Sequence, residues 1–255
     1  MPSEIDLEFN SSEVKPFLAM PVFGSIPPGT VKSLLETVLM LKSKKVRFEI
    51  SFNCGSSVIE VSRNILADEF LNSDCDRIFW LDADLEWNAK DFFTVLGLSS
   101  IYEAVGASYR FKEEAVRFSM RLEHTGSVDL NEHGLIGAKG SGMGFVCITR
   151  KVMEAMAKSA PRFKLDRNSK NDMAQVFHTS IGEDSLFYGE DMDFFRRMTE
   201  AGFEYLLYPH AKLGHVGNKV FEGALADWLR GDGTDELVEE TVRIVDSGTG
   251  LRGVS

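Results

Sequence analysis

The sequence predicts an α/β fold of the Rossmann-like type, in which a mostly parallel central sheet is flanked by helices. Patterns typical of strands and helices alternate over the front half of the chain in the order βαβαβα, which implies parallel strands joined by right-handed crossovers. The 255 residues are 44% hydrophobic and 26% charged, a composition that can bury a full α/β core. An apolar strand at 77–81 leads into carboxylates, at the strand end where open α/β sheets bind ligands.

The first two strand–helix units follow from apolar runs and their spacing. Residues 17–23 form an apolar run typical of a buried strand, and a Pro/Gly-rich loop leads to a helix at 30–44. Residues 45–52 alternate like a strand, and 56–72 predict a second helix with its apolar residues on one side. In the first helix, we expect five apolar residues at helical spacing to face the core: Val31, Leu34, Leu35, Val38 and Leu41.

The same signals predict the remaining elements. The expected strands lie at 77–81, 104–111, 116–122, 135–148, 176–181 and 203–208, and the expected helices at 88–98, 150–159, 190–201, 221–230 and 235–245. Residues 161–175 are polar without periodicity, which predicts a flexible lid. We expect three parts: a flexible N-terminal arm at 1–15, a central domain at 16–218, and a helical C-terminal appendage at 219–255 with a disordered end.

Charge and cysteine content argue against several classes of protein. The net charge of −11 opposes non-specific nucleic-acid binding by the whole surface. Residues 139–170 carry eight basic and two acidic side chains, a net of +6, which suits either a local anionic partner or a solvated face. Three cysteines without CxxC spacing argue against a disulfide framework or a zinc site. The sequence has no apolar run of membrane-spanning length and no signal-peptide pattern, so we expect a cytoplasmic protein.

Asp82 and Asp84 follow the apolar strand at a spacing of two residues. Side chains alternate along a strand, so both carboxylates point the same way and repel each other if they are buried together. A hard divalent cation such as Mg²⁺ or Mn²⁺ removes that repulsion. Alternatively, Asp84 caps the helix that begins near Asn88.

Two later sites carry chemistry as well. Glu190 and Asp191 open a helix after Gly189, and His215 lies between glycines near the end of the last strand pattern. Each lies where an element meets a loop, so they could converge with the aspartates on one rim of the sheet. Alternatively, Glu190 and Asp191 are favourable charges at a helix N-terminus, and His215 is a structural histidine.

Four motifs in this order resemble the GT-A glycosyltransferases, most closely small bacterial and phage-type members. The motifs are Ser62-Arg63-Asn64 before the Asp-x-Asp, the segment from Gly140 to Phe145, the Glu-Asp-x-x-Phe helix start at Glu190, and Lys212 to Gly217. The resemblance covers residues 16–218 and implies a GT-A catalytic domain with a small antiparallel sheet on the acceptor side.

The resemblance also implies roles for the acidic residues and the histidine. Asp84 binds Mn²⁺ or Mg²⁺ at the donor diphosphate, Asp82 holds the ribose or donor sugar or assists the metal, and His215 completes the metal shell. Asp191 is the expected catalytic base, which takes the proton from an acceptor hydroxyl, with Glu190 as the next choice.

Further residues are expected to bind the nucleotide-sugar. The end of the first strand would form the floor of the nucleotide pocket, and the Gly-rich segment would lie along the donor sugar, where glycine allows close backbone contact. Arg63 either faces the base or the diphosphate of the nucleotide, or forms a solvent-exposed salt bridge on its helix. The expected set is Pro21, Val22, Phe23, Arg63, Asp82, Ala83, Gly142 and Met143.

The predicted function is a metal-dependent hexosyltransferase that moves a sugar from a UDP- or GDP-sugar to an acceptor hydroxyl, with inversion favoured. The acceptor is a glycan or a modified DNA base. A nucleotidyltransferase of related fold is an alternative, but residues 23–30 lack the basic side chains expected of its Gly-rich loop. A non-catalytic nucleotide-sugar binding module is a third class.

Overall fold

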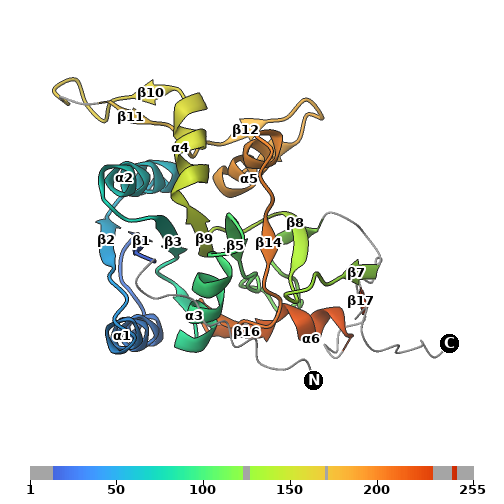
Figure 1. Cartoon of the computed structure of the whole chain (residues 1–255). Helices are drawn as coiled ribbons and strands as arrows, with labels where there is room; N and C mark the ends of the chain where they lie inside the picture. The colour runs from blue at the N-terminus through green and yellow to red at the C-terminus, as the bar shows by residue number, and fades with distance from the viewer. Residues whose placement is uncertain (1–13, 123–126, 170–171, 232–242, 246–255) are drawn as a thin grey trace.

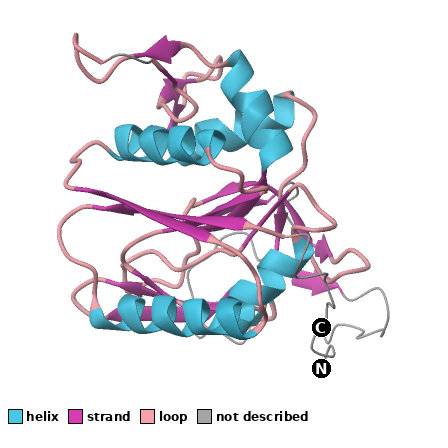
Figure 2. Cartoon of the chain, turned by 60° about the vertical axis from the view of Figure 1, so that its left-hand side comes forward, coloured by secondary structure: helices cyan, strands magenta, loops and turns pink. Residues whose placement is uncertain are grey.

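A computed structural model describes residues 14–122, 127–169, 172–231 and 243–245. Helices cover both faces of a central sheet of eight strands (Figure 1, Figure 2). The strand order across this sheet is β2-β1-β3-β9-β5-β14-β8-β6. The strands are β1 (Pro16–Val22), β2 (Glu49–Cys54), β3 (Arg77–Leu81), β5 (Ala104–Gly106), β6 (Met120–Leu122), β8 (Ile136–Ser141), β9 (Phe145–Thr149) and β14 (Leu206–Leu207).

Most strands of this sheet run in the same direction. β1 pairs in parallel with both β2 and β3, and β5 pairs in parallel with β14. β9 lies antiparallel between β3 and β5, and β8 is antiparallel to β14 and β6. Six of the eight strands therefore run in one direction, which confirms the predicted α/β fold with a mostly parallel central sheet.

The helices divide between the two faces of the sheet (Figure 2). Two clusters of buried side chains lie on opposite faces of the sheet, and each cluster packs against one of two groups of helices. The first group is α2 (Ile59–Asn72), α4 (Arg150–Ser159) and α5 (Glu190–Glu200); the second is α1 (Pro28–Ser43) and α3 (Ala89–Leu98).

Small sheets surround the central one. The largest is antiparallel and has the order β16-β15-β4, with β4 (Leu85–Glu86) directly after the Asp-x-Asp segment. Two short antiparallel hairpins, β10–β11 and β12–β13, follow α4 and precede α5 along the chain. The other elements are β7 (Ser127–Asp129), β10 (Arg162–Phe163), β11 (Met173–Ala174), β12 (Ser180–Ile181), β13 (Phe187–Tyr188), β15 (Lys212–Val216), β16 (Val220–Ala224), α6 (Leu225–Leu229) and β17 (Arg243–Val245).

Helix α1 does not bury the face that its apolar spacing predicts. Leu41 is buried, but Val31 and Leu35 are 39% and 57% exposed, so the prediction was wrong for these two. Ser33 and Thr37 face inward instead. Ser33 Oγ accepts the Trp87 backbone N–H at 3.0 Å, and Thr37 Oγ1 accepts the Trp87 indole N–H at 2.9 Å. A buried indole N–H is stabilised by a hydrogen-bond partner, and Ser33 and Thr37 on the inward face of the helix provide partners for Trp87.

Several predicted strands are shorter or divided. The strand expected at 104–111 ends at Gly106, and β6 begins only at Met120. The Gly-rich region at 135–148 forms β8 and β9, separated by the turn at 142–144. Tertiary contacts replace strand pairing elsewhere, as at Phe177, which is buried outside any strand.

The chain ends also differ from expectation. Most of the predicted arm, residues 1–13, lies outside the described residues, but Val14 is buried and Lys15 pairs with Glu49 at 2.6 Å. The helix predicted at 221–230 was wrong for its first residues, because β16 pairs with β15 across the expected boundary at 218 and only α6 is helical. Residues 235–242 and 246–255 lie outside the described part, and 243–245 form β17 rather than a helix.

None of the helices in the described ranges combines the length and the apolar character needed to cross a membrane.

Candidate active site

Main-chain hydrogen bonds bring two distant segments to the end of β3. This strand is buried along its whole length, and Asp82 follows it directly. The Asp82 N–H donates to the Gly144 carbonyl at 3.0 Å, and the Val216 N–H donates to the Asp84 carbonyl at 2.8 Å. β15 also pairs with β4. The backbone therefore holds both aspartates between the Gly-rich turn and the strand that carries the late histidine.

The Asp84 carboxylate faces two nitrogen groups. Its Oδ2 lies 2.5 Å from Lys112 Nζ and 3.5 Å from His215 Nε2. Burial by itself would raise the pKa of Asp84, but the hydrogen bonds with His215 and Lys112 outweigh it and lower this pKa to about 2. Asp84 does not cap α3, because Asn88 Oδ1 accepts the Lys90 N–H in that role. It is a fully ionised carboxylate at neutral pH.

The tautomer of His215 follows from its other neighbour. Nδ1 lies 2.8 Å from the Arg110 carbonyl oxygen, which can only accept, so Nδ1 carries the proton. The hydrogen bond from Nε2 to Asp84 therefore requires a doubly protonated ring, and only a ring without the Nε2 proton offers this nitrogen to a metal ion. The ring also packs edge-on against Tyr109, with centroids 4.9 Å apart. A histidine held through one nitrogen, with the other directed at a carboxylate, has the arrangement of a metal ligand.

The donor set fits a divalent cation. Asp84 Oδ2 and His215 Nε2 lie 3.5 Å apart, and one cation could bind both atoms once Nε2 carries no proton. Lys112 already places an ammonium on Asp84, so the site attracts cations. Carboxylate and imidazole are ligands of divalent metals, and these two residues could hold Mn²⁺ or Mg²⁺.

Asp82 has a different environment. Arg63 is 3% exposed and donates from Nη2 to Asp82 Oδ1 at 3.0 Å and from Nε to Glu190 Oε1 at 3.2 Å. Burial opposes the charge of Arg63, but the two carboxylates outweigh it, so its pKa is raised. Asp82 Oδ2 lies 3.4 Å from the Tyr109 hydroxyl. Both oxygens of Asp82 thus have protein partners, and Arg63 forms a buried ion-pair network rather than a solvent-exposed salt bridge.

Asn64, the second residue of the Arg-Asn pair on α2, has a structural role. Its Nδ2 donates to the Phe177 carbonyl, and its Oδ1 accepts the Phe177 N–H, both at 2.8 Å. Asn64 thereby anchors the segment that precedes the β12–β13 hairpin, while Arg63 binds Asp82 and Glu190. One turn of α2 ties the end of β3 to the start of α5.

Asp191 is the carboxyl of this site whose pKa is strongly raised; outside the site, burial also raises the pKa of Asp91 on α3 to about 6. Burial, and then the negative charge of Glu190, raise the pKa of Asp191 to about 6. Its Oδ1 accepts the Met192 N–H at 2.7 Å in the first turn of α5. Asp193, by contrast, is fully buried and pairs with Arg197 at 2.6 Å, so it anchors α5 structurally.

The glycines between β8 and β9 are required by close packing. A Cβ at Gly144 would lie 2.6 Å from Asp82 Oδ2, and a Cβ at Gly142 would lie 2.2 Å from the Tyr109 hydroxyl. Any side chain at Gly144 would displace the Asp82 carboxylate. Met143 between them is fully buried in the core, so its side chain packs beneath the sheet.

The remaining residues expected at the donor lie near the end of β1. The register pairs Ala19 with Trp80, which brings the end of β1 beside the end of β3. Pro21 and Val22 are buried in β1, whereas Phe23 is 75% exposed. Ala83 lies between the two aspartates and is partly buried.

Sequence reasoning missed Tyr109 and Lys112. Both follow β5, which runs in the same direction as β3, so its carboxyl end reaches the same rim of the sheet. The rule that ligands bind at the carboxyl ends of parallel strands could have identified them. It did not, because the strand was expected to continue to residue 111, whereas β5 ends at Gly106. The sequence also contained no sign that Gly144 contacts Asp82.

A second group of potential metal ligands lies elsewhere. Ligand atoms of Glu49, Asp74 and Cys75 lie within 4.8 Å of one another. Lys15 pairs with both carboxylates of this group, so an ammonium ion already neutralises it. The group is a structural ion-pair cluster at the start of β1.

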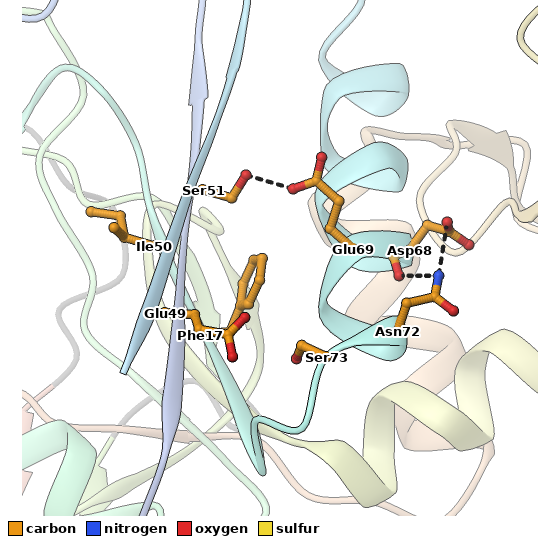
Figure 3. A pocket seen from close by; sticks show the side chains of 8 residues that line it. All are labelled: Phe17, Glu49, Ile50, Ser51, Asp68, Glu69, Asn72 and Ser73. Atoms are coloured by element: carbon orange, nitrogen blue, oxygen red, sulfur yellow. Dashed lines mark hydrogen bonds between the residues drawn. The ribbon is translucent and has the colours of Figure 1, made fainter. Parts of the chain in front are cut away.

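An acidic groove between β2 and α2 is also separate from the candidate site (Figure 3). Its volume is about 530 Å³. Ser51 Oγ donates to Glu69 Oε2 at 2.5 Å across it, and Asn72 Nδ2 donates to Asp68 on α2. None of the sequence-predicted site residues lines it; the lining residues are Phe17, Glu49, Ile50, Ser51, Asp68, Glu69, Asn72 and Ser73.

The central sheet, its flanking helices and the small antiparallel sheets define a GT-A-like fold. Among solved structures, the chain is similar to A197 from STIV, with 20% identity and a TM-score of 0.53 over 83% of this chain and 90% of that one. A weaker likeness, with 9% identity and a TM-score of 0.42, is to a structure of GalNAc-T7 with UDP, GalNAc and Mn²⁺; it covers 80% of this chain and 44% of that one. No protein-family model and no curated protein sequence matches the chain.

Proposed function

We propose that this protein is a metal-dependent glycosyltransferase that moves a sugar from a nucleotide-sugar of UDP or GDP type to an acceptor hydroxyl. One observation carries the proposal. Asp84 Oδ2 and His215 Nε2 lie 3.5 Å apart, where one cation could bind both, and the buried carboxyl of Asp191, with a pKa of about 6, belongs to the same cluster of charges. A cation site beside a tuned carboxyl suits a reaction that releases a diphosphate and deprotonates a hydroxyl.

Asp84 and His215 would hold Mn²⁺ or Mg²⁺. The bound ion supplies Lewis-acid neutralisation of the departing diphosphate. Arg63 orients Asp82, because it donates to Asp82 Oδ1 at 3.0 Å. Asp82 and the adjacent Ala83 would then meet the ribose or the donor sugar.

The end of β1 and the Gly-rich turn would complete the donor pocket. Pro21, Val22 and the exposed Phe23 lie at the strand end beside β3. Gly142 is the natural contact from the Gly-rich turn, through its backbone, since the Met143 side chain is buried beneath the sheet.

Asp191 is the proposed base. A carboxyl with a pKa of about 6 is mostly ionised at neutral pH and is a stronger base than an ordinary aspartate. Glu190 is less suited, because its Oε1 accepts from buried Arg63. A carboxylate base acting on an acceptor hydroxyl favours inversion, and the anomeric configuration of the product, read by NMR, would test it.

The acceptor is proposed to be a glycan or a modified DNA base. Three basic side chains on the 161–169 segment, Arg162, Lys164 and Arg167, are exposed, which supports a polyanionic acceptor. Affinity for hydroxymethylated duplex DNA, measured against salt concentration, tests the DNA case. An affinity that does not fall as salt rises would reject it.

The function itself is tested by thermal shift and calorimetry with UDP-, GDP-, dTDP- and CMP-sugars, each with and without Mn²⁺. A specific donor should raise the melting temperature only when Mn²⁺ is present, since ligand that binds the folded state stabilises it. Donor binding without any release of nucleoside diphosphate would leave a non-catalytic binding module. Release of inorganic pyrophosphate from a nucleoside triphosphate would instead identify a nucleotidyltransferase.

A further inference from the structure

Lys112 occupies the place at Asp84 where a metal ion is expected. Its Nζ lies 2.5 Å from Asp84 Oδ2, the oxygen that also faces His215 Nε2 at 3.5 Å. The ion pair is only partly buried, with side-chain exposures of 36% for Lys112 and 40% for Asp84. An ammonium in so open a position can exchange for another cation.

The loop around Lys112 is held in place. Glu113 pairs with Arg117 at 2.6 Å, and Glu114 pairs with Lys219 at 2.7 Å. A Cβ at Gly217 would lie 3.3 Å from Lys112 Cδ, so this glycine leaves room for the lysine stem. Lys112 lies on the loop between β5 and β6, and contacts with the turn between β15 and β16 help to direct it to Asp84, while its ammonium remains on a flexible four-carbon chain.

A divalent ion and an ammonium compete for one carboxylate oxygen. Unlike charges attract Lys112 to Asp84 in the free protein, but a metal ion at the same oxygen repels it. The displaced ammonium then needs a new anion. In a nucleotide-sugar complex the nearest added anion is the diphosphate, and a lysine ammonium is a common phosphate partner.

We propose that Lys112 couples metal binding to nucleotide binding, by holding Asp84 in the free protein and moving to the donor diphosphate once a metal ion takes Asp84. This inference rests on the proposed function. It makes Lys112 a phosphate-binding residue that also lowers the affinity of the empty site for metal. Metal binding without nucleotide is therefore weaker than the ligand set alone would allow.

The test uses the full chain with Mn²⁺ and UDP as probes, and isothermal calorimetry or Mn²⁺ electron paramagnetic resonance as the readout. Lys112→Met should tighten Mn²⁺ binding in the absence of UDP about tenfold, because a competing charge is gone. It should weaken UDP binding at saturating Mn²⁺ about tenfold, because a phosphate contact is gone. The factor by which UDP improves Mn²⁺ binding should fall by about tenfold.

Two further variants control for charge and shape. Lys212→Met removes the same charge from β15, where Lys212 pairs with Glu222 at 2.7 Å, and should leave both affinities unchanged. Lys112→Arg keeps the charge and should retain most of the coupling.

The outcomes separate the two proposals. If the native protein binds UDP with Mn²⁺ but Lys112→Met changes neither affinity, or weakens Mn²⁺ binding without UDP, the coupling role is overturned and the proposed function stands. If the native protein binds neither Mn²⁺ nor any nucleoside diphosphate, both proposals fail.

Discussion

The two aspartates of the Asp-x-Asp segment lie two residues apart but in different surroundings. Asp82 is bound by buried Arg63, and the side chains of Asp82, Arg63 and Glu190 are 20%, 4% and 15% exposed. Asp84 is 40% exposed, and its partner Lys112 is 36% exposed. One half of the site is therefore a closed ion-pair network, and the other half is open to solvent.

The difference shows how burial decides which carboxylate can serve a ligand. An ion pair inside the protein has lost its hydration, so breaking it leaves an uncompensated charge. An exposed pair has kept most of its hydration and exchanges partners at little cost. We infer that Asp82 is a fixed part of the framework and that Asp84 is the carboxylate available to a metal ion.

The largest expected effect comes from Asp84→Asn. This change removes a charged ligand while keeping the shape, and it should lower sugar transfer by about a thousandfold and abolish Mn²⁺ binding. Asp82→Asn should leave Mn²⁺ affinity within about threefold, because Asp82 Oδ1 is bound to Arg63. Calorimetric Mn²⁺ titration of both variants checks this, with Glu222→Gln on β16 as the control. Loss of Mn²⁺ binding in Asp82→Asn alone would reverse the assignment.

Arg63→Met removes the central residue of the buried ion-pair network with Asp82 and Glu190. It leaves Asp82 and Glu190 without their shared partner and should cost about 3–5 kcal/mol in the free energy of unfolding. Arg63→Lys keeps the charge but cannot donate to both carboxylates in the same geometry, so its cost should be intermediate. Urea denaturation measures these values. The matched control is Arg117→Met, which breaks the exposed pair with Glu113 and should change nothing measurable. Equal stability of Arg63→Met and native protein would contradict a closed network.

The pH profile compares the proposed base, Asp191, with the proposed metal ligand, Asp84. Burial and Glu190 raise the pKa of Asp191 to about 6, so this carboxyl is protonated and inactive as a base below that pH. Asp84 stays ionised over the same range, since its pKa is about 2. The kcat/KM for transfer should therefore fall about tenfold per pH unit below pH 6 and level off above it. Asp191→Asn should remove this limb while donor binding remains. An unchanged limb in that variant would exclude Asp191 as the base.

The smallest effect is expected from Tyr109→Phe. The hydroxyl of Tyr109 lies 3.4 Å from Asp82 Oδ2, a long hydrogen bond, and its loss should cost about 1 kcal/mol of stability or less. Mn²⁺ affinity should not change, because the ring that packs against His215 is retained. A large loss of Mn²⁺ binding would mean that the hydroxyl, not the ring, positions the histidine.

The fold was predictable because its signals are local. The apolar run that forms β3 is buried at every position, and the helix predicted at 150–159 coincides with α4. Helix α1 shows where local signals fail. Its apolar spacing predicted that Val31 and Leu35 face the core, but the distant Trp87 needs the hydroxyls of Ser33 and Thr37.

The sequence by itself determined which residues could carry chemistry: the two aspartates after a buried strand, the carboxylates that open α5, and a histidine between glycines. It also determined the α/β fold class, because periodicity and strand–helix order are properties of short segments. Only the tertiary structure decided that Arg63 closes one half of the site and that Lys112 lies on Asp84. The reason is that burial and ion pairing depend on residues far apart in the chain, and a local sequence pattern does not show which distant residues come into contact.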